Sequence, residues 1–147
     1  MIEQTVKLKG AIELMIRGSD GRVKSVLEKD NLIVTVGKSF LASWLAATSH
    51  SNSFMPYTAT GSGTNAPTSG DTALQTEVAR AANTPSSSSN VLALSIVFAP
   101  GTSTGAITEA GLFSASSGGT MFSHVTFAVQ NILAGDSLTI NWSVTFS

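Results

Sequence analysis

The sequence has no cysteine, little charge and no long hydrophobic run, and each shortage excludes a class of protein. Without cysteine it can form no disulfide framework, thiolate metal site or cysteine nucleophile. Charged residues make up 12% of the 147, about half of the roughly 25% that is usual. The 8 Lys and Arg against 9 Asp and Glu leave no basic surplus for nucleic acid. No run of about 18 apolar residues could cross a bilayer, so we expect neither a nucleic-acid nor a membrane partner.

The few charges are concentrated near the N-terminal end. Residues 1–38 hold 12 of the 17 charged side chains and carry a net charge of +2, whereas residues 39–147 carry −3. After Arg80 only Glu109 and Asp136 are charged. Because the surface of a soluble monomer usually has about 25–35% charged residues, two interpretations stay open. The protein is a sheet coated with Ser and Thr, or other subunits cover much of its surface.

Alternation of apolar and polar residues is the main structural signal that is present. It is clearest in residues 138–146, and it is typical of antiparallel sheets with one buried face. Residues 5–17 and 22–28 flank an Asp-Gly turn and predict an N-terminal β-hairpin over about residues 5–28. Further strands are predicted over 54–60, 92–98, 107–113 and 121–129. We expect residues 1–147 to form a single, mainly β domain, an antiparallel, jelly-roll-like β-sandwich of about seven or eight strands.

A helix and a loop interrupt the predicted strands. Apolar residues from Phe40 to Leu45 recur at helical spacing, so we predict the main helix over about residues 38–47, packed on the sheet. A short second helix is predicted over residues 71–78, with Asp71 at its N-terminus. Pro85 and four serines predict a flexible loop over residues 83–90. The expected structural core includes Trp44, Phe98, Trp142 and Phe146.

No arrangement of residues indicates catalysis. Gly37-Lys38-Ser39 lacks the preceding glycine of a phosphate-binding loop, because that position is Leu32. No Gly-x-Ser-x-Gly elbow is present. We interpret the two histidines structurally, His50 as a solvated loop residue and His124 as a hydrogen-bonded strand residue. We therefore expect no enzymatic activity, catalytic residue, metal site or cofactor.

Two sets of charged residues are candidates for specific contacts. Glu109 lies among apolar neighbours, and a buried carboxylate needs a cluster of backbone N–H groups or a cation as partner. Arg80 is the only cation after residue 38, so we predict a buried Glu109–Arg80 ion pair. Lys7, Lys9 and Arg17 share one face of the first predicted strand, and we expect that face to contact a partner.

Several stretches in this order resemble small virion structural proteins of tailed bacteriophages. They are the N-terminal hairpin with a following helix that opens on Gly37-Lys38, the Gly-rich residues 61–63 before the segment 71–80, and the strands 107–113 and 138–144. The resemblance spans most of the chain. It implies a non-enzymatic building block of a virus particle, assembled in the cytoplasm of the bacterial host.

The resemblance leaves the position on the particle open. Our first hypothesis is a capsid decoration (cement) protein, a homotrimer that binds the major capsid protein on the outside of the shell. A head fibre and a tail-fibre or baseplate module are alternatives within the same class. A carbohydrate- or receptor-binding β-sandwich would use Tyr57 and residues 83–90. A glycosidase that uses Glu109 and Asp136 is the remaining alternative.

Overall fold

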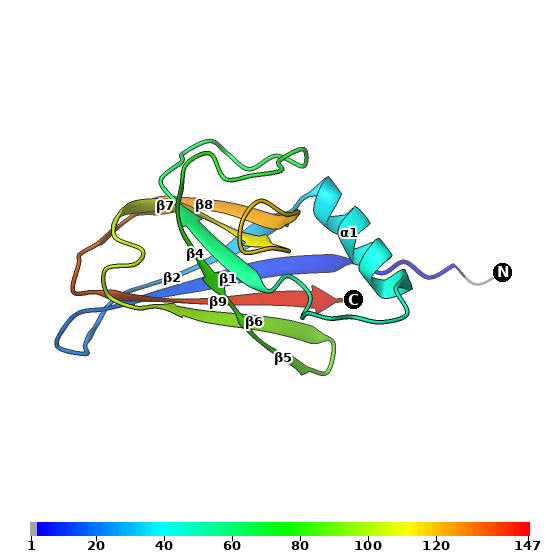
Figure 1. Ribbon diagram of the computed structural model, residues 1–147, viewed down its shortest axis with the longest axis horizontal. Coiled ribbons are helices and arrows are strands. Elements are labelled where there is room, and N and C mark those ends of the chain that lie inside the picture. The colour runs from blue at the N-terminus through cyan, green and yellow to red at the C-terminus, as the bar shows by residue number, and fades with distance from the viewer. Residues whose placement is uncertain (1–2) are drawn as a thin grey trace.

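The computed structural model describes residues 3–147 and is mainly β, with nine antiparallel strands in one nearly closed sheet and one helix (Figure 1). The prediction of a mainly β, sandwich-like fold with one main helix is confirmed, with nine strands instead of seven or eight. The strands lie in the order β4-β3-β7-β8-β2-β1-β9-β6-β5. The elements are β1 (Leu8–Arg17), β2 (Val23–Ile33), α1 (Thr35–Ala46), β3 (Tyr57–Gly61), β4 (Glu77–Ala82), β5 (Thr84–Ser88), β6 (Val91–Phe98), β7 (Gly105–Phe113), β8 (Met121–Ile132) and β9 (Ser137–Phe146).

Two stretches of chain pass from one layer of the sandwich to the other. Residues 23–31 of β2 pair with β1, whereas Leu32 and Ile33 pair with β8. Likewise β4 pairs with β3, and β5, which follows after Asn83, pairs with β6. Strands that change layers in this way make the corners of a sandwich. The first layer therefore contains β2, β1, β9, β6 and β5, and the second contains β8, β7, β3 and β4.

The core lies between the two layers. Trp142 on β9 is only 1% exposed, and its indole N–H donates to Thr58 Oγ1 on β3 across the core at 2.9 Å. Phe98 is equally buried, so the prediction that these two aromatic residues form the core is confirmed. Trp44 and Phe146 pack against the core but stay partly exposed. The aromatic side chains thus join elements that are distant in the sequence.

The helix α1 begins three residues earlier than predicted and lies against β8. Leu41 is buried, and Phe40 and Trp44 pack on the core through Phe54. Gly37 permits the close approach, because a Cβ atom there would lie 2.6 Å from the Cα atom of Phe122.

Two of the local predictions are wrong. The predicted second helix over residues 71–78 does not form, and Glu77 begins β4 instead. The backbone N–H groups of Gln75 and Thr76 donate to a buried carboxylate and not to helical carbonyl groups. The predicted flexible loop over residues 83–90 contains β5, which pairs along β6. Pro85 is tolerated because β5 is an edge strand.

The close contact at Gly37 makes a stability prediction. We expect Gly37→Ala to lower the free energy of unfolding by about 1–3 kcal/mol, because the new methyl group overlaps the backbone of β8. This value is the net change, after the gain of about 1 kcal/mol that alanine in place of glycine brings to a helix. Urea denaturation measures the difference. Gly70→Ala is the control, since a Cβ atom there meets nothing within 4 Å; equal stability of both variants would contradict the account.

Candidate functional site

The second layer carries a buried cluster of three titratable side chains, Asp71, Glu109 and His124. His124 Nδ1 lies 2.7 Å from Asp71 Oδ2, and His124 Nε2 lies 3.0 Å from Glu109 Oε2. His124 and Glu109 come from neighbouring positions on β8 and β7, while Asp71 belongs to the loop 62–76 between β3 and β4. The cluster therefore fastens the loop 62–76 to the outer side of the sheet. Figure 1 shows this loop above β7 and β8.

Glu109 is fully buried, and its carboxylate is an acceptor for the backbone of the loop. Oε1 accepts the N–H groups of Gly63 and Thr76 at 3.0 and 2.9 Å, and Oε2 accepts that of Gln75 at 3.2 Å. Two glycines leave room for it, because a Cβ atom at Gly61 or Gly63 would lie within 2.6 Å of Oε1. The Gly-Ser-Gly sequence is thus explained by a carboxylate and not by a ligand.

The predicted Glu109–Arg80 ion pair is wrong. Arg80 instead pairs with Glu77 at 2.6 Å, and its guanidinium lies 3.9 Å from the ring centroid of Phe113. It also donates to the carbonyl groups of Ala115 and Gly118. The strand register explains the error, since β3 pairs its residue 59 with Arg80 and its residue 61 with Glu109. The cluster of backbone N–H groups was the partner that sequence reasoning also allowed.

The two carboxylates around His124 determine the number of protons in the cluster. A neutral imidazole has one N–H, which serves only one of the two contacts. A second proton must therefore lie on the ring or on a carboxylate when both contacts form. Of the three side chains, Glu109 is 0% and His124 3% exposed, and only Asp71 is partly open to solvent.

Asp71 is the partly exposed member of the cluster. Burial acts to raise its pKa, but the hydrogen bonds with Thr68 and His124 outweigh burial and hold the pKa below the ordinary value of 3.8. The Thr68 contacts are a backbone N–H at 2.9 Å and the hydroxyl at 2.7 Å. Asp71 therefore contributes to stability in its charged form, by closing the turn at residues 68–71.

The outer face of the first layer is open. Across β2, β1, β9 and β6, a mainly apolar row of outward side chains lies next to a polar row, and beyond that lies a row of mainly small residues. We call these three rows the exposed face. They are Val26, Met15, Thr139 and Val97; Glu28, Glu13, Asn141 and Ser95; and Asp30, Ala11, Ser143 and Ala93.

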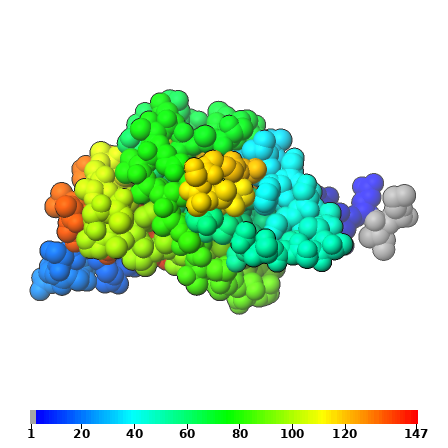
Figure 2. All heavy atoms as spheres, in the orientation of Figure 1, coloured from blue at the N-terminus to red at the C-terminus, as the bar shows by residue number. Residues whose placement is uncertain are grey.

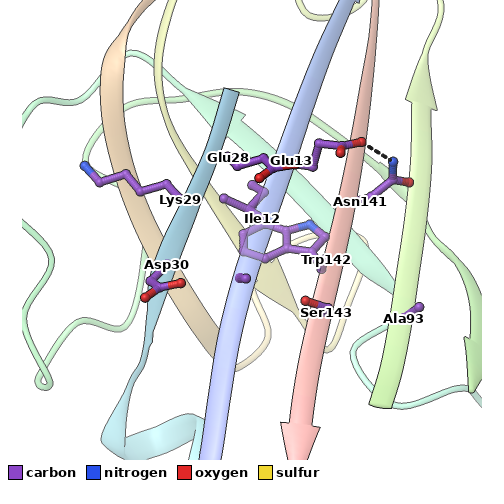
Figure 3. A pocket seen from close by; sticks show the side chains of 10 residues that line it. Ile12, Glu13, Glu28, Lys29, Asp30, Ala93, Asn141, Trp142 and Ser143 are labelled. Atoms are coloured by element: carbon purple, nitrogen blue, oxygen red, sulfur yellow. Dashed lines mark hydrogen bonds between the residues drawn. The ribbon is translucent and has the colours of Figure 1, made fainter. Parts of the chain in front are cut away.

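The small residues create a hollow of about 610 Å³ in the exposed face (Figure 3). Glu13 and Glu28 are directly opposite each other on adjacent strands, and Asn141 donates to Glu13 at 3.2 Å. Trp142 also borders the hollow, but its ring is turned into the core and is 1% exposed. The hollow therefore presents carboxylates, an amide and hydroxyls, without an aromatic platform for a sugar.

The residues predicted to contact a partner flank this face. Lys9 and Arg17 are exposed on the side of β1 that carries Glu13, and Lys7, which precedes β1, is also exposed. Lys9 lies 4.0 Å from Asp30. Their role in binding stays a prediction.

The remaining candidates are held in separate local contacts. His50 is exposed and stacks on Trp44 with ring centroids 3.8 Å apart. Tyr57 is partly buried against a second, smaller apolar cluster. Asp136 pairs with Lys24 at 2.7 Å, which holds the pKa of Asp136 below 3.8, and shares no contact with Glu109.

Residues 3–147 contain neither a group of side chains suited to a metal ion nor a membrane-spanning helix. No group of three or more His, Asp or Glu residues there could hold a metal ion. No helix in that range is long and apolar enough to cross a membrane. No family model, curated protein or solved structure matches the chain.

The buried carboxylate makes a second stability prediction. We expect Glu109→Gln to lower the free energy of unfolding by about 2–4 kcal/mol, because an amide NH₂ would face backbone donors in a buried site. Urea denaturation checks the value. Glu28→Gln, at an exposed position, is the matched control and should change stability by less than about 0.5 kcal/mol. Similar losses for the two variants would refute the role of Glu109.

The lowered pKa of Asp71 predicts a pH dependence. Because the folded pKa lies below the unfolded one, the unfolded chain binds its proton first, and stability falls as the pH drops below about 3.8. Asp71→Asn should lose less stability than the wild type between about pH 5 and about pH 3. Urea midpoints at both pH values measure this. Parallel profiles for the two proteins would count against the assignment.

Proposed function

We propose that this chain is a non-enzymatic structural protein of a bacteriophage virion, which decorates the outside of the capsid as a homotrimer. The observation that carries the proposal is the exposed face, where Val26, Met15 and Val97 form an apolar row, interrupted by Thr139, beside a row of charged and polar side chains. Val26 and Val97 on that row are 53% and 60% exposed. Exposed apolar side chains beside polar ones are the usual composition of a protein–protein interface. The major capsid protein is the proposed partner.

The buried cluster supports the non-enzymatic part of the proposal. A general acid or base must reach the proton that it transfers. Glu109 and His124 instead use their polar atoms to hold the loop 62–76, and both are buried. Both side chains therefore serve to hold this loop on the sheet.

The placement of charge supports an assembled subunit. Lys9, Glu13 and Glu28 of the N-terminal hairpin lie on or beside the exposed face. The outward residues of β9 on the same face are Thr, Asn and Ser. A neighbour seated on this face would meet charge on one side and hydroxyl groups on the other.

The carbohydrate-binding alternative loses the features on which it depended. Tyr57 is partly buried, and residues 84–88 form a strand in place of a loop. A tail-fibre or baseplate module could use the same exposed face, so particle binding has to separate it from a decoration protein.

Rebinding to particles tests the proposal. The purified chain should bind mature capsids that have been stripped of decoration, and Val26→Asp should weaken binding at least tenfold, because it places a charge in the apolar row. Val129→Asp is the control, since Val129 is 51% exposed but lies on β8, outside the exposed face. Binding to tails and not to capsids would overturn the decoration role, and binding to neither would overturn the virion role.

Light scattering tests the oligomeric state. We expect the mass of a trimer, three times the 15.1 kDa of the chain, at micromolar concentration. A monomer under these conditions would contradict the homotrimer.

A further inference from the structure

The sheet is open along one seam, between β4 and β6. β5 pairs with β6 as far as Thr84 and Ser95, but at Asn83 the chain turns toward β3. Residues 96–98 of β6 and the facing edge of β4 therefore have no strand between them. A groove of about 470 Å³ lies there, and Val78, Ala79, Val97 and Thr102 are among its lining residues. We call this groove the seam.

The corresponding gap on the other side of the sandwich is filled. Where β2 diverges from β8, Ser25 Oγ donates to Gln130 Oε1 at 3.0 Å and Lys29 Nζ to the Thr126 carbonyl at 2.6 Å. In the part of the chain that the structure describes, no hydrogen bond joins β4 to β6. Of the two gaps, only the seam therefore has no hydrogen bond across it between the described residues of the two strands.

The seam is also apolar. Val78 is 42% and Val97 60% exposed on its two sides. Beneath them the core is covered by Ala79, Ala81 and Ile96, which stay partly exposed. Unpaired strand edges beside exposed apolar side chains are a template for pairing with another strand.

The chain also contains an exposed segment of which only the last residue, Lys7, has a backbone partner. Residues 3–7, which we call the arm, are exposed and project away from the body beyond α1 (Figure 2). Lys7 exchanges backbone hydrogen bonds with Ser147 at 2.6 and 2.9 Å, and no ladder continues into the described residues before it. Val6 is 65% exposed, and by alternation it is on the same side of the strand as Leu8 and Ile12.

We propose that the arm of one copy lies in the seam of a neighbouring copy and adds a strand there. The four residues before Lys7 would span about 13 Å when extended, which is the length of about four of the six residues of β4. Val6 would then cover the small residues Ala79 and Ala81, with Thr5 outward beside Val97. The inference rests on the proposed self-association of the chain, and it identifies the contact through which the copies join.

The positions of arm and seam determine the kind of assembly. The arm leaves the body at the end where α1 lies, whereas the last residues of β6, which line the seam, lead into a turn at the opposite end (Figure 1). The arm therefore reaches the seam of another copy and not its own. A head-to-tail contact closes into a ring where the rotation between copies allows it and otherwise forms a filament; the proposed trimer is the closed form.

Disulfide trapping tests the contact directly, because the chain has no cysteine of its own. We expect the double variant Thr5→Cys, Val97→Cys to form cross-linked dimers and higher species on mild oxidation, seen on a non-reducing gel. A disulfide needs Cα atoms about 4.4–6.8 Å apart. The matched control is Thr5→Cys with Val129→Cys, which places the second thiol beside the filled gap and should stay uncross-linked. Deletion of residues 1–6 should convert the oligomer to monomer in light scattering.

The outcomes separate this inference from the proposed function. A wild-type chain that is monomeric overturns both the homotrimer and the arm contact. An oligomer that survives the deletion, or that cross-links through position 129 and not 97, overturns the arm contact alone. Loss of the oligomer on deletion together with selective cross-linking at position 97 supports it.

Discussion

The second layer of the protein depends on one constraint, the buried carboxylate of Glu109. A charge with no exposed surface is tolerated only where donors surround it, and here the donors are three backbone N–H groups and His124. To supply them, the loop 62–76 must lie across the sheet, with glycine at positions 61 and 63. The same contacts prevent residues 71–78 from forming a helix, since they use the N–H groups that a helix would need. One side chain thus determines the path of a long connection.

This arrangement divides the molecule by role. The titratable groups of the second layer are used to hold its own loops: Glu109 and His124 fasten the loop 62–76, and Arg80 holds the turn at Ala115 and Gly118. The first layer leaves its charged, hydroxyl and apolar side chains exposed in ordered rows. On this face the charged residues of β1 and β2 lie beside the Thr, Asn and Ser residues of β9. A neighbour that covers the face would meet both kinds of side chain, which is the physical basis of the proposed structural role.

Local patterns predicted those features that local interactions determine. Alternation over residues 138–146 identified β9 and the inward position of Trp142, because a period of two places alternate side chains on opposite faces. Helical spacing identified α1 in the same way. The strand β5 was missed because Pro and Ser favour loops, and only its pairing with β6 makes it a strand. The partner of Glu109 was assigned to Arg80 because side chains are visible in a sequence, whereas backbone N–H donors are not. The glycines at positions 61 and 63 were the available signal.

Amide hydrogen exchange in the native protein tests the central claim most directly. The amides of Gly63, Gln75 and Thr76 have no backbone acceptor, and their hydrogen bonds end on Glu109. If the carboxylate holds the loop, these amides exchange slowly, at rates comparable to those of β7 and β8, while those of the exposed Thr72 and Ala73 exchange fast. Exchange at Gly63, Gln75 and Thr76 as fast as at Thr72 and Ala73 would contradict the account.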